Sequence, residues 1–162
     1  MSDASPRDPS PVLLFDGGCN LCHGFVRWVV ARDRRAEFRF AALQSHAARR
    51  VLESVSVAPE SLLDSVVLVL PGQSPQVKSD AVLAVAARLG FPWSLTRCGR
   101  VLPRRLRNHI YDWVAARRYR WFGRHKQCLV PAPKLLSRFL DAAEFSGIGP
   151  QDPHPGGRGE IQ

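Results

Sequence analysis

Two cysteines, Cys19 and Cys22, are separated by two residues and follow an apolar strand pattern at the start of a helical one. This spacing places both thiols about one turn apart on one helix face. Gly17 and Gly18 allow a sharp turn that puts Cys19 at the helix N-terminus, where unpaired amides and the helix dipole favour a thiolate. The pattern predicts thiol–disulfide exchange, in which Cys19, expected to be the more exposed thiol, attacks and Cys22 resolves.

Asp16, which precedes the two glycines, is a third candidate catalytic residue. Its carboxylate could accept a proton from the resolving thiol, or it could cap the helix by accepting backbone amides. A carboxylate so close to Cys19 also raises the pKa of that thiol. Asp16 therefore opposes the helix dipole unless a nearby arginine offsets its charge.

His23 directly follows the dithiol, and Cys19-x-x-Cys22-His23 spells the c-type haem attachment motif. Haem attachment normally occurs outside the cytoplasm, and the only methionine, Met1, is a poor second iron ligand. We therefore expect His23 to be an exposed or half-buried helix residue, and a candidate for tuning Cys19.

Zinc is the stronger alternative to redox chemistry. Cys19 and Cys22 could be completed as ligands by His125 and Cys128, or by Cys98. Redox chemistry without a metal or other cofactor is favoured, because a strand-to-helix turn is where a merely structural cysteine pair is least expected. The active group would then be a Cys19–Cys22 disulfide.

The composition is that of one folded domain. Of the 162 residues, 45% are hydrophobic, which is enough for a packed core. No run approaches the ~18 to 20 apolar residues of a membrane span, and residues 1–11 lack the apolar stretch of a secretory signal. We therefore expect a cytoplasmic protein, in which cysteines fit a redox or metal role better than a disulfide framework.

The elements expected from periodicity alternate between strand and helix. They are a strand at 12–15, a helix at 21–32, a strand at 37–40, a helix at about 42–53, a strand at 65–70, a hairpin partner at 76–78 and a helix ending before Gly90. Ser79 or Asp80 would cap that last helix. The order is typical of an α/β thioredoxin-like three-layer sandwich, with the dithiol after its first strand.

A helical extension over residues 91–145 would complete a domain spanning 12–145, with the sandwich itself at 12–90. It comprises a linker at 91–103, a helix at 104–122 and a short amphipathic helix near 135–140. Residues 1–11 and 146–162 are predicted to be a disordered leader and tail.

The net charge of +9 comes mostly from arginine, and arginines alternate with aromatic residues between Arg97 and Lys126. Such a face could bind an acidic partner, an anionic membrane surface or nucleic acid. We favour instead a helix whose apolar stripe packs against the sheet, which makes nucleic acid an unlikely partner and leaves peripheral membrane contact open. The stripe comprises Leu106, Ile110, Trp113, Val114 and Trp121.

The chain resembles the DCC family of predicted thiol-disulfide oxidoreductases, named for an Asp-x-x-Cys-x-x-Cys motif. The motif is Asp16-Gly17-Gly18-Cys19-Asn20-Leu21-Cys22, and the resemblance covers about residues 12–141. The other matching stretches are Phe38-Arg39-Phe40-Ala41, Ser79-Asp80-Ala81, Tyr111 with Ala115-Ala116-Arg117-Arg118-Tyr119, Cys128-Leu129-Val130-Pro131 and Arg138-Phe139-Leu140.

The resemblance implies a thioredoxin-like fold and a dithiol that exchanges disulfides with a thiol or disulfide substrate, for which we expect a protein. It also makes Ser79, Asp80 and Cys128 candidate supporting residues, although a helix cap accounts for the first two. Cys128 could be a third redox thiol or a core residue.

One departure from better-known thioredoxin relatives concerns the strand expected beside the dithiol. Those proteins place a cis-proline before it, which helps present a substrate backbone and keeps metal away, whereas Asp64 and Ser65 precede Val66 here. The alternative of a zinc-stabilised binding module, contacting an acidic partner through the arginine-rich helix, therefore stays open.

Overall fold

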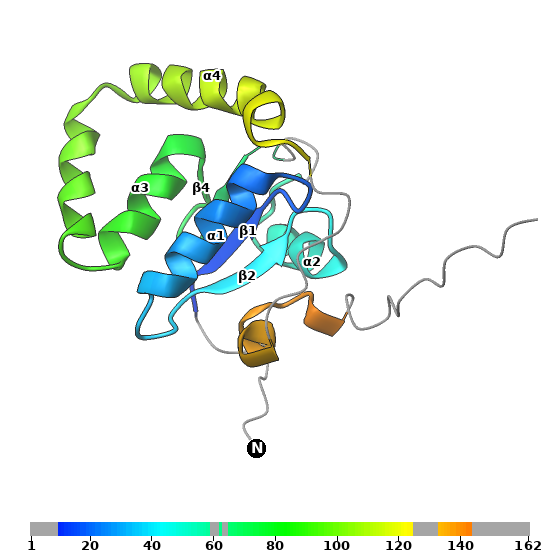
Figure 1. The fold of residues 1–162 in the computed structure, drawn as a ribbon. Helices are drawn as coiled ribbons and strands as arrows, with labels where there is room; N and C mark the ends of the chain where they lie inside the picture. The colour runs from blue at the N-terminus through cyan, green and yellow to red at the C-terminus, as the bar shows by residue number, and fades with distance from the viewer. Residues whose placement is uncertain (1–9, 59–61, 63–64, 125–132, 144–162) are drawn as a thin grey trace, which may run out of the picture.

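The computed structural model describes residues 10–58, 62, 65–124 and 133–143 (Figure 1). Two candidate zinc ligands, His125 and Cys128, lie outside these residues. So do the tail predicted at 146–162 and all but the last two residues of the predicted leader.

A four-stranded sheet forms the centre of the molecule. Its strands are β1 (Val12–Phe15), β2 (Arg39–Ala42), β3 (Val67–Val69) and β4 (Gln76–Val77), in the order β2-β1-β3-β4. β1 and β2 are parallel, as the strand–helix–strand pattern predicted, and β3 is antiparallel to both β1 and β4. β1 and β3 are apolar throughout because both of their faces are covered.

Helices cover the two faces of this sheet. α1 (Asn20–Arg32) and α3 (Lys78–Arg88) lie on one face, where Val29 and Val85 pack with Leu13 of β1. α2 (His46–Ser54) lies on the other face, where Leu52 packs with Leu14. The protein is therefore a mixed α/β fold with helices on both sides of the sheet, as expected.

The boundaries around β2 and α2 differ from the predicted ones by a few residues. The amides of Glu37 and Phe38 donate to the Asp33 carboxylate, at 3.2 and 3.0 Å, so these residues precede the strand. α2 starts only after Ser45, whose hydroxyl accepts the Ala48 amide at 3.1 Å as a helix cap.

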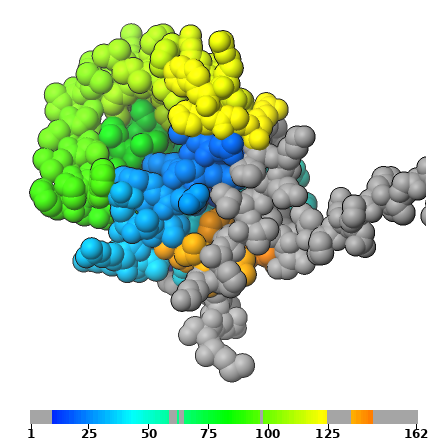
Figure 2. Space-filling view, viewed as in Figure 1, coloured from blue at the N-terminus to red at the C-terminus, as the bar shows by residue number. Residues whose placement is uncertain are grey.

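The arginine-rich segment forms the expected helix α4 (Arg104–Phe122). Before it, the predicted linker contains the 3₁₀ helix η2 (Trp93–Val101), which packs on α3. Together they form an arch around the outside of α3 that reaches over α1 (Figures 1 and 2). None of the helices in the described residues is long and apolar enough to cross a membrane.

The prediction that the apolar stripe of α4 packs against the sheet is wrong. α4 contacts helices α1 and α3, and its inward face carries Tyr111, Arg118 and Tyr119. Because α4 lies above other helices, most of the stripe points outward. Leu106, Ile110, Trp113 and Trp121 are 47%, 50%, 47% and 51% exposed.

The segment at 133–143 runs along the outer edge of the sheet beside β2 and is orange in Figure 1. Phe139 forms a parallel bridge with Phe40, and the Leu140 amide donates to the Phe40 carbonyl at 2.8 Å. The Ala42 amide donates to the Asp141 carboxylate at 2.7 Å. This segment therefore covers a sheet edge that β2 would otherwise leave open.

Candidate active site

The dithiol lies at the junction between β1 and α1, as predicted. Cys19 is the N-cap residue of α1, and its amide donates to the Asp16 carbonyl at 3.3 Å, which closes the turn after the strand. Cys22 follows in the first turn of the helix. Cys19 therefore lies at the positive end of the helix dipole.

Both thiols are buried, which contradicts the expectation that Cys19 is the more exposed. Cys19 is 0% exposed and Cys22 5%. The end of α4 and the residues directly after it provide the cover: Arg124 forms an antiparallel bridge with Cys19, and the Asn20 side-chain amide donates to the Phe122 carbonyl at 2.7 Å. The sequence of α1 alone could not reveal a cover supplied by a helix a hundred residues away.

The two thiols have opposite acidities. A hydrogen bond from the Cys22 thiol lowers the pKa of Cys19 to about 6, against the effect of burial, and the positive charge of Arg118 adds to the lowering. The same hydrogen bond, together with burial, raises the pKa of Cys22 well above its usual range. Cys19 is therefore the thiolate near neutral pH and Cys22 the protonated partner.

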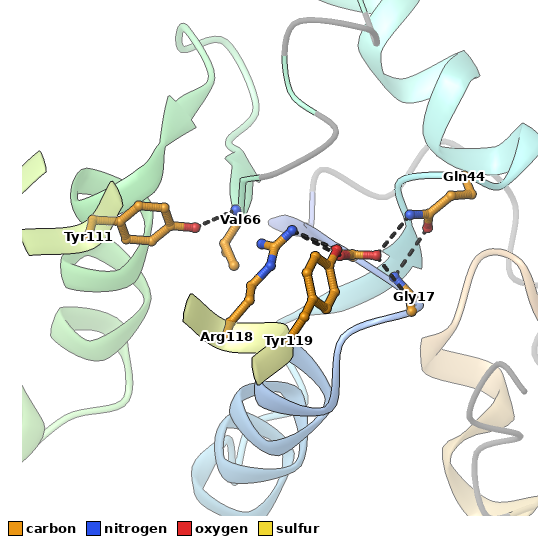
Figure 3. A network of polar contacts seen from close by, with 8 residues as sticks. Gly17, Gln44, Val66, Tyr111, Arg118 and Tyr119 are labelled. Atoms are coloured by element: carbon orange, nitrogen blue, oxygen red, sulfur yellow. Dashed lines mark hydrogen bonds and ion pairs between the residues drawn. The ribbon is translucent and has the colours of Figure 1, made fainter. Parts of the chain in front are cut away.

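Asp16 is the centre of a polar network, and its partners Gln44, Arg118 and Tyr119 are labelled in Figure 3. Its Oδ1 accepts the Gly18 amide and the Gln44 side-chain amide, both at 2.9 Å, and its Oδ2 accepts Arg118 at 3.0 Å and the Tyr119 hydroxyl. Burial alone would raise the pKa of Asp16, but these hydrogen bonds and the Arg118 charge outweigh it and lower that pKa. Asp16 is therefore an ionised acceptor that fixes the turn before the dithiol, and only a weak base.

Arg118 is the arginine that offsets the negative charge of Asp16. The sequence analysis did not identify which arginine would do so. It is 2% exposed. Its guanidinium forms an ion pair with Asp16 and donates a hydrogen bond to the Tyr119 hydroxyl at 2.9 Å. Burial opposes the charged form, yet its hydrogen bond to Tyr119 and the neighbouring thiols raise the pKa of Arg118, so it stays cationic. The available signal was its place in the stretch Ala115–Tyr119, which the family resemblance included.

Tyr111 is a second residue that the sequence left without a role. Its hydroxyl accepts the Val66 amide, just before β3, at 2.9 Å (Figure 3). Burial raises the pKa of Tyr111 to about 12, so the hydroxyl is neutral. Tyr111 thus accepts the main-chain amide just before β3, at the end of that strand nearest the dithiol.

Ser79 and Asp80 hold α3 to α4 and do not cap α3. Val77 is the N-cap residue of α3, and within the described residues no side chain caps that helix end. The Ser79 hydroxyl donates to the Asn108 side chain at 2.5 Å, and Asp80 pairs with Arg104 and Arg107 at 2.7 and 2.8 Å. The predicted cap is wrong because the chain enters α3 directly from β4.

His23 is buried, at 4% exposure, and not exposed or half-buried as expected. Its ring packs edge-on against Phe15, with the ring centres 5.9 Å apart. This contact places His23 in the core between α1 and the sheet.

Of the candidate zinc ligands, the structure describes Cys19, Cys22 and Cys98 but not His125 and Cys128. Among the described residues, no group of three or more histidine, cysteine or acidic side chains is arranged to hold a metal ion. Cys98 is exposed on η2, and His125 and Cys128 lie outside the described part of the chain.

Comparison with known proteins gives a consistent result. The family model for DCC1-like thiol-disulfide oxidoreductases matches residues 13–124. The uncharacterized protein YuxK of Bacillus subtilis is 38% identical over 84% of this chain and 98% of its own length. A chloroplastic DCC family protein of Arabidopsis thaliana is 40% identical over 75% of this chain and 70% of its own. No solved structure matches significantly.

Proposed function

The chain belongs to the DCC1-like thiol-disulfide oxidoreductase family, and on this basis we propose that it exchanges disulfides with a thiol or disulfide substrate through Cys19 and Cys22. The observation that carries the proposal is the paired acidity of the two thiols at a helix N-terminus. The pKa of Cys19 is lowered to about 6, while that of Cys22 is raised. Cys19 is thus the thiolate that attacks first, and Cys22 stays protonated until the second step.

The reaction proceeds in two exchanges. The Cys19 thiolate attacks one sulfur of the substrate disulfide, forms a mixed disulfide and releases the other sulfur as a thiolate. Cys22 then loses its proton, attacks the Cys19 sulfur and releases the second substrate thiolate. The protein dithiol is oxidised by two electrons and the substrate disulfide is reduced, and the reverse sequence oxidises a substrate dithiol.

Asp16 and Arg118 act on this reaction from beside the thiols. Arg118 stabilises the Cys19 thiolate, and its charge lowers the pKa of that thiol. Asp16 holds Arg118 in place through their ion pair. When Cys19 becomes a disulfide, its negative charge and its hydrogen bond with Cys22 disappear, so Cys22 becomes more acidic at the step in which it must attack.

The fold we propose is thioredoxin-like. The strand order β2-β1-β3-β4, the parallel β1–β2 pair and the dithiol at the start of α1 support it. We propose the cytoplasm as the location, since a reducing compartment keeps the dithiol ready to donate electrons. Fractionation of cells that express the tagged protein tests that location.

The test of function is a redox titration of the metal-free protein, with mass spectrometry locating any disulfide. We expect a reversible Cys19–Cys22 disulfide, loss of turnover in Cys19→Ser and a trapped mixed disulfide in Cys22→Ser. Cys98→Ser, at an exposed site, is the control and should behave as wild type. One bound zinc that protects both thiols, or full activity of Cys19→Ser, would contradict the proposal.

A further inference from the structure

A pocket of about 180 Å³ lies beside Cys22, between α1, α3 and α4. Cys22 and Phe25 of α1 form one wall, Val82 of α3 a second, and Val114 and Ala115 of α4 a third. Cys19 is hydrogen-bonded to Cys22. The Cys19 sulfur therefore lies beside the Cys22 sulfur, which lines the pocket.

The polar groups of the pocket wall are already engaged. The Tyr111 hydroxyl accepts the Val66 amide, and Arg118 is paired with Asp16. The remaining wall residues are apolar apart from the Cys22 thiol. A ligand with several hydrogen-bonding groups would lose more water there than these few wall groups could replace, so the pocket favours an apolar occupant.

The size of the pocket limits the occupant. An engineered apolar cavity of about 150 Å³ binds benzene. A pocket of about 180 Å³ therefore accommodates one aromatic ring or one branched alkyl group.

Two contacts restrict access by an extended protein segment. Peptides that bind beside a strand rely on free main-chain donors, but the Val66 amide at the start of β3 is taken by Tyr111. The end of α4 and the residues directly after it also cover Cys19, through the Arg124 bridge and the hydrogen bond between Asn20 and Phe122. The pocket beside Cys22 is an opening that reaches one of the two thiols.

We propose that this pocket binds the apolar substituent of a low-molecular-weight disulfide. The inference rests on the proposed function and departs from the expectation of a protein substrate. The Cys19 thiolate attacks the sulfur that carries the seated substituent and expels the other half as a thiolate. Cys22 then attacks the Cys19 sulfur, and the seated half leaves as its thiolate, which balances the two-electron exchange.

Binding is tested first, without any reaction. ¹⁹F NMR should show fluorobenzene binding to the full chain and to the Cys19→Ser/Cys22→Ser variant. Ala115→Phe, which fills the pocket, should abolish binding, whereas Ala116→Phe, at the neighbouring exposed position, should retain it. If Ala115→Phe does not fold, Val82→Phe fills the same pocket from α3. Absence of fluorobenzene binding overturns the inference whatever the redox titration gives.

Exchange is tested with benzyl and 2-hydroxyethyl methanethiosulfonate, which each transfer a sulfur substituent to a thiolate and release methanesulfinate. Relative to a free small thiol, Cys19 should prefer the benzyl reagent at least tenfold, and Ala115→Phe but not Ala116→Phe should remove that preference. Equal rates of Cys19 with the benzyl and 2-hydroxyethyl reagents overturn the inference. So does reduction of a disulfide-bonded protein substrate at the same rate by the wild type and by Ala115→Phe. A dithiol that forms no reversible disulfide overturns the proposed function even where fluorobenzene binds.

Discussion

Arg118 and Asp16 are 102 positions apart in the chain, yet their side chains form an ion pair at 3.0 Å. Both are almost fully buried, with side-chain exposures of 3% and 5%. The pair connects α4 to the turn that positions the dithiol. The helical extension is therefore part of the candidate active site.

Loss of the Asp16 carboxylate should cost stability, because it leaves the buried Arg118 charge without its partner. We expect Asp16→Asn to lower the free energy of unfolding by about 3–5 kcal/mol in urea denaturation. The matched control is Asp112→Asn, which breaks the half-exposed Lys78–Asp112 pair at 2.8 Å and should cost no more than about 1 kcal/mol. Equal losses in the two variants would show that Arg118 does not depend on Asp16.

The thiolate of Cys19 should form with a midpoint near pH 6. Its ultraviolet absorbance, measured against pH in a Cys98→Ser/Cys128→Ser background, checks this. Cys22→Ala should move the midpoint up toward 9.0, because the hydrogen bond from Cys22 is the largest cause of the lowered pKa. Arg118→Gln should move it in the same direction by less. An unchanged midpoint in Cys22→Ala would contradict the hydrogen bond.

Stability should follow the same titration. Since the folded pKa of Cys19 lies below the ordinary value of 9.0, its ionisation stabilises the reduced protein. That contribution is complete above about pH 9 and is lost as the pH falls through about 6. The difference in unfolding free energy between the reduced wild type and Cys19→Ser should therefore increase from pH 6 to pH 9. A constant difference would mean that folding leaves the acidity of Cys19 unchanged.

The hydrogen bond between Asn20 and the Phe122 carbonyl should limit access to Cys19. We expect Asn20→Ala to raise the rate of Cys19 alkylation by iodoacetamide severalfold, because the end of α4 loses its hydrogen bond to the start of α1 and only the Arg124 bridge of the described contacts over Cys19 remains. Asn108→Ala is the control, because it breaks a hydrogen bond from α4 to α3 away from the thiols. Equal rates in the two variants would show that general loosening of α4 sets the rate.

The segment beside β2 should contribute directly to stability. Asp141→Ala leaves the buried Ala42 amide without its acceptor, so we expect a loss of about 1–3 kcal/mol in urea denaturation. Glu53→Ala, at an exposed position near the end of α2, should change stability by less than about 0.5 kcal/mol. No loss in Asp141→Ala would mean that water replaces the carboxylate.

The sequence predicted the central layers well, because local patterns determine them. The strand at Val12–Phe15, the helix that follows it and the bounds of α4 were readable from periodicity, and Gly90, at φ 80°, ends α3 as expected. Errors near β2 arose because side-chain hydrogen bonds from Asp33 and Ser45 decide where that strand begins and the next helix starts.

The surroundings of the dithiol could be predicted only in part. Cys19, Cys22 and Asp16 were found because their spacing is local. Arg118 and Tyr111 were missed because nothing in a helix pattern tells which face meets another helix, and the stripe on α4 pointed to the wrong face. The burial of Cys19 has the same origin, since its cover comes from a distant segment.

The segment at 133–143 also sets an order of events during synthesis. Ala42 is bonded to an acceptor 99 positions further along the chain. At about 5–20 residues per second, a ribosome needs roughly 5–20 s to add that length. Once the four strands have paired, the edge at β2 stays uncovered until Asp141 has been added, and an uncovered edge is where a second chain can pair. Slower synthesis of the residues between β4 and Asp141 therefore lengthens the time for which this edge is exposed.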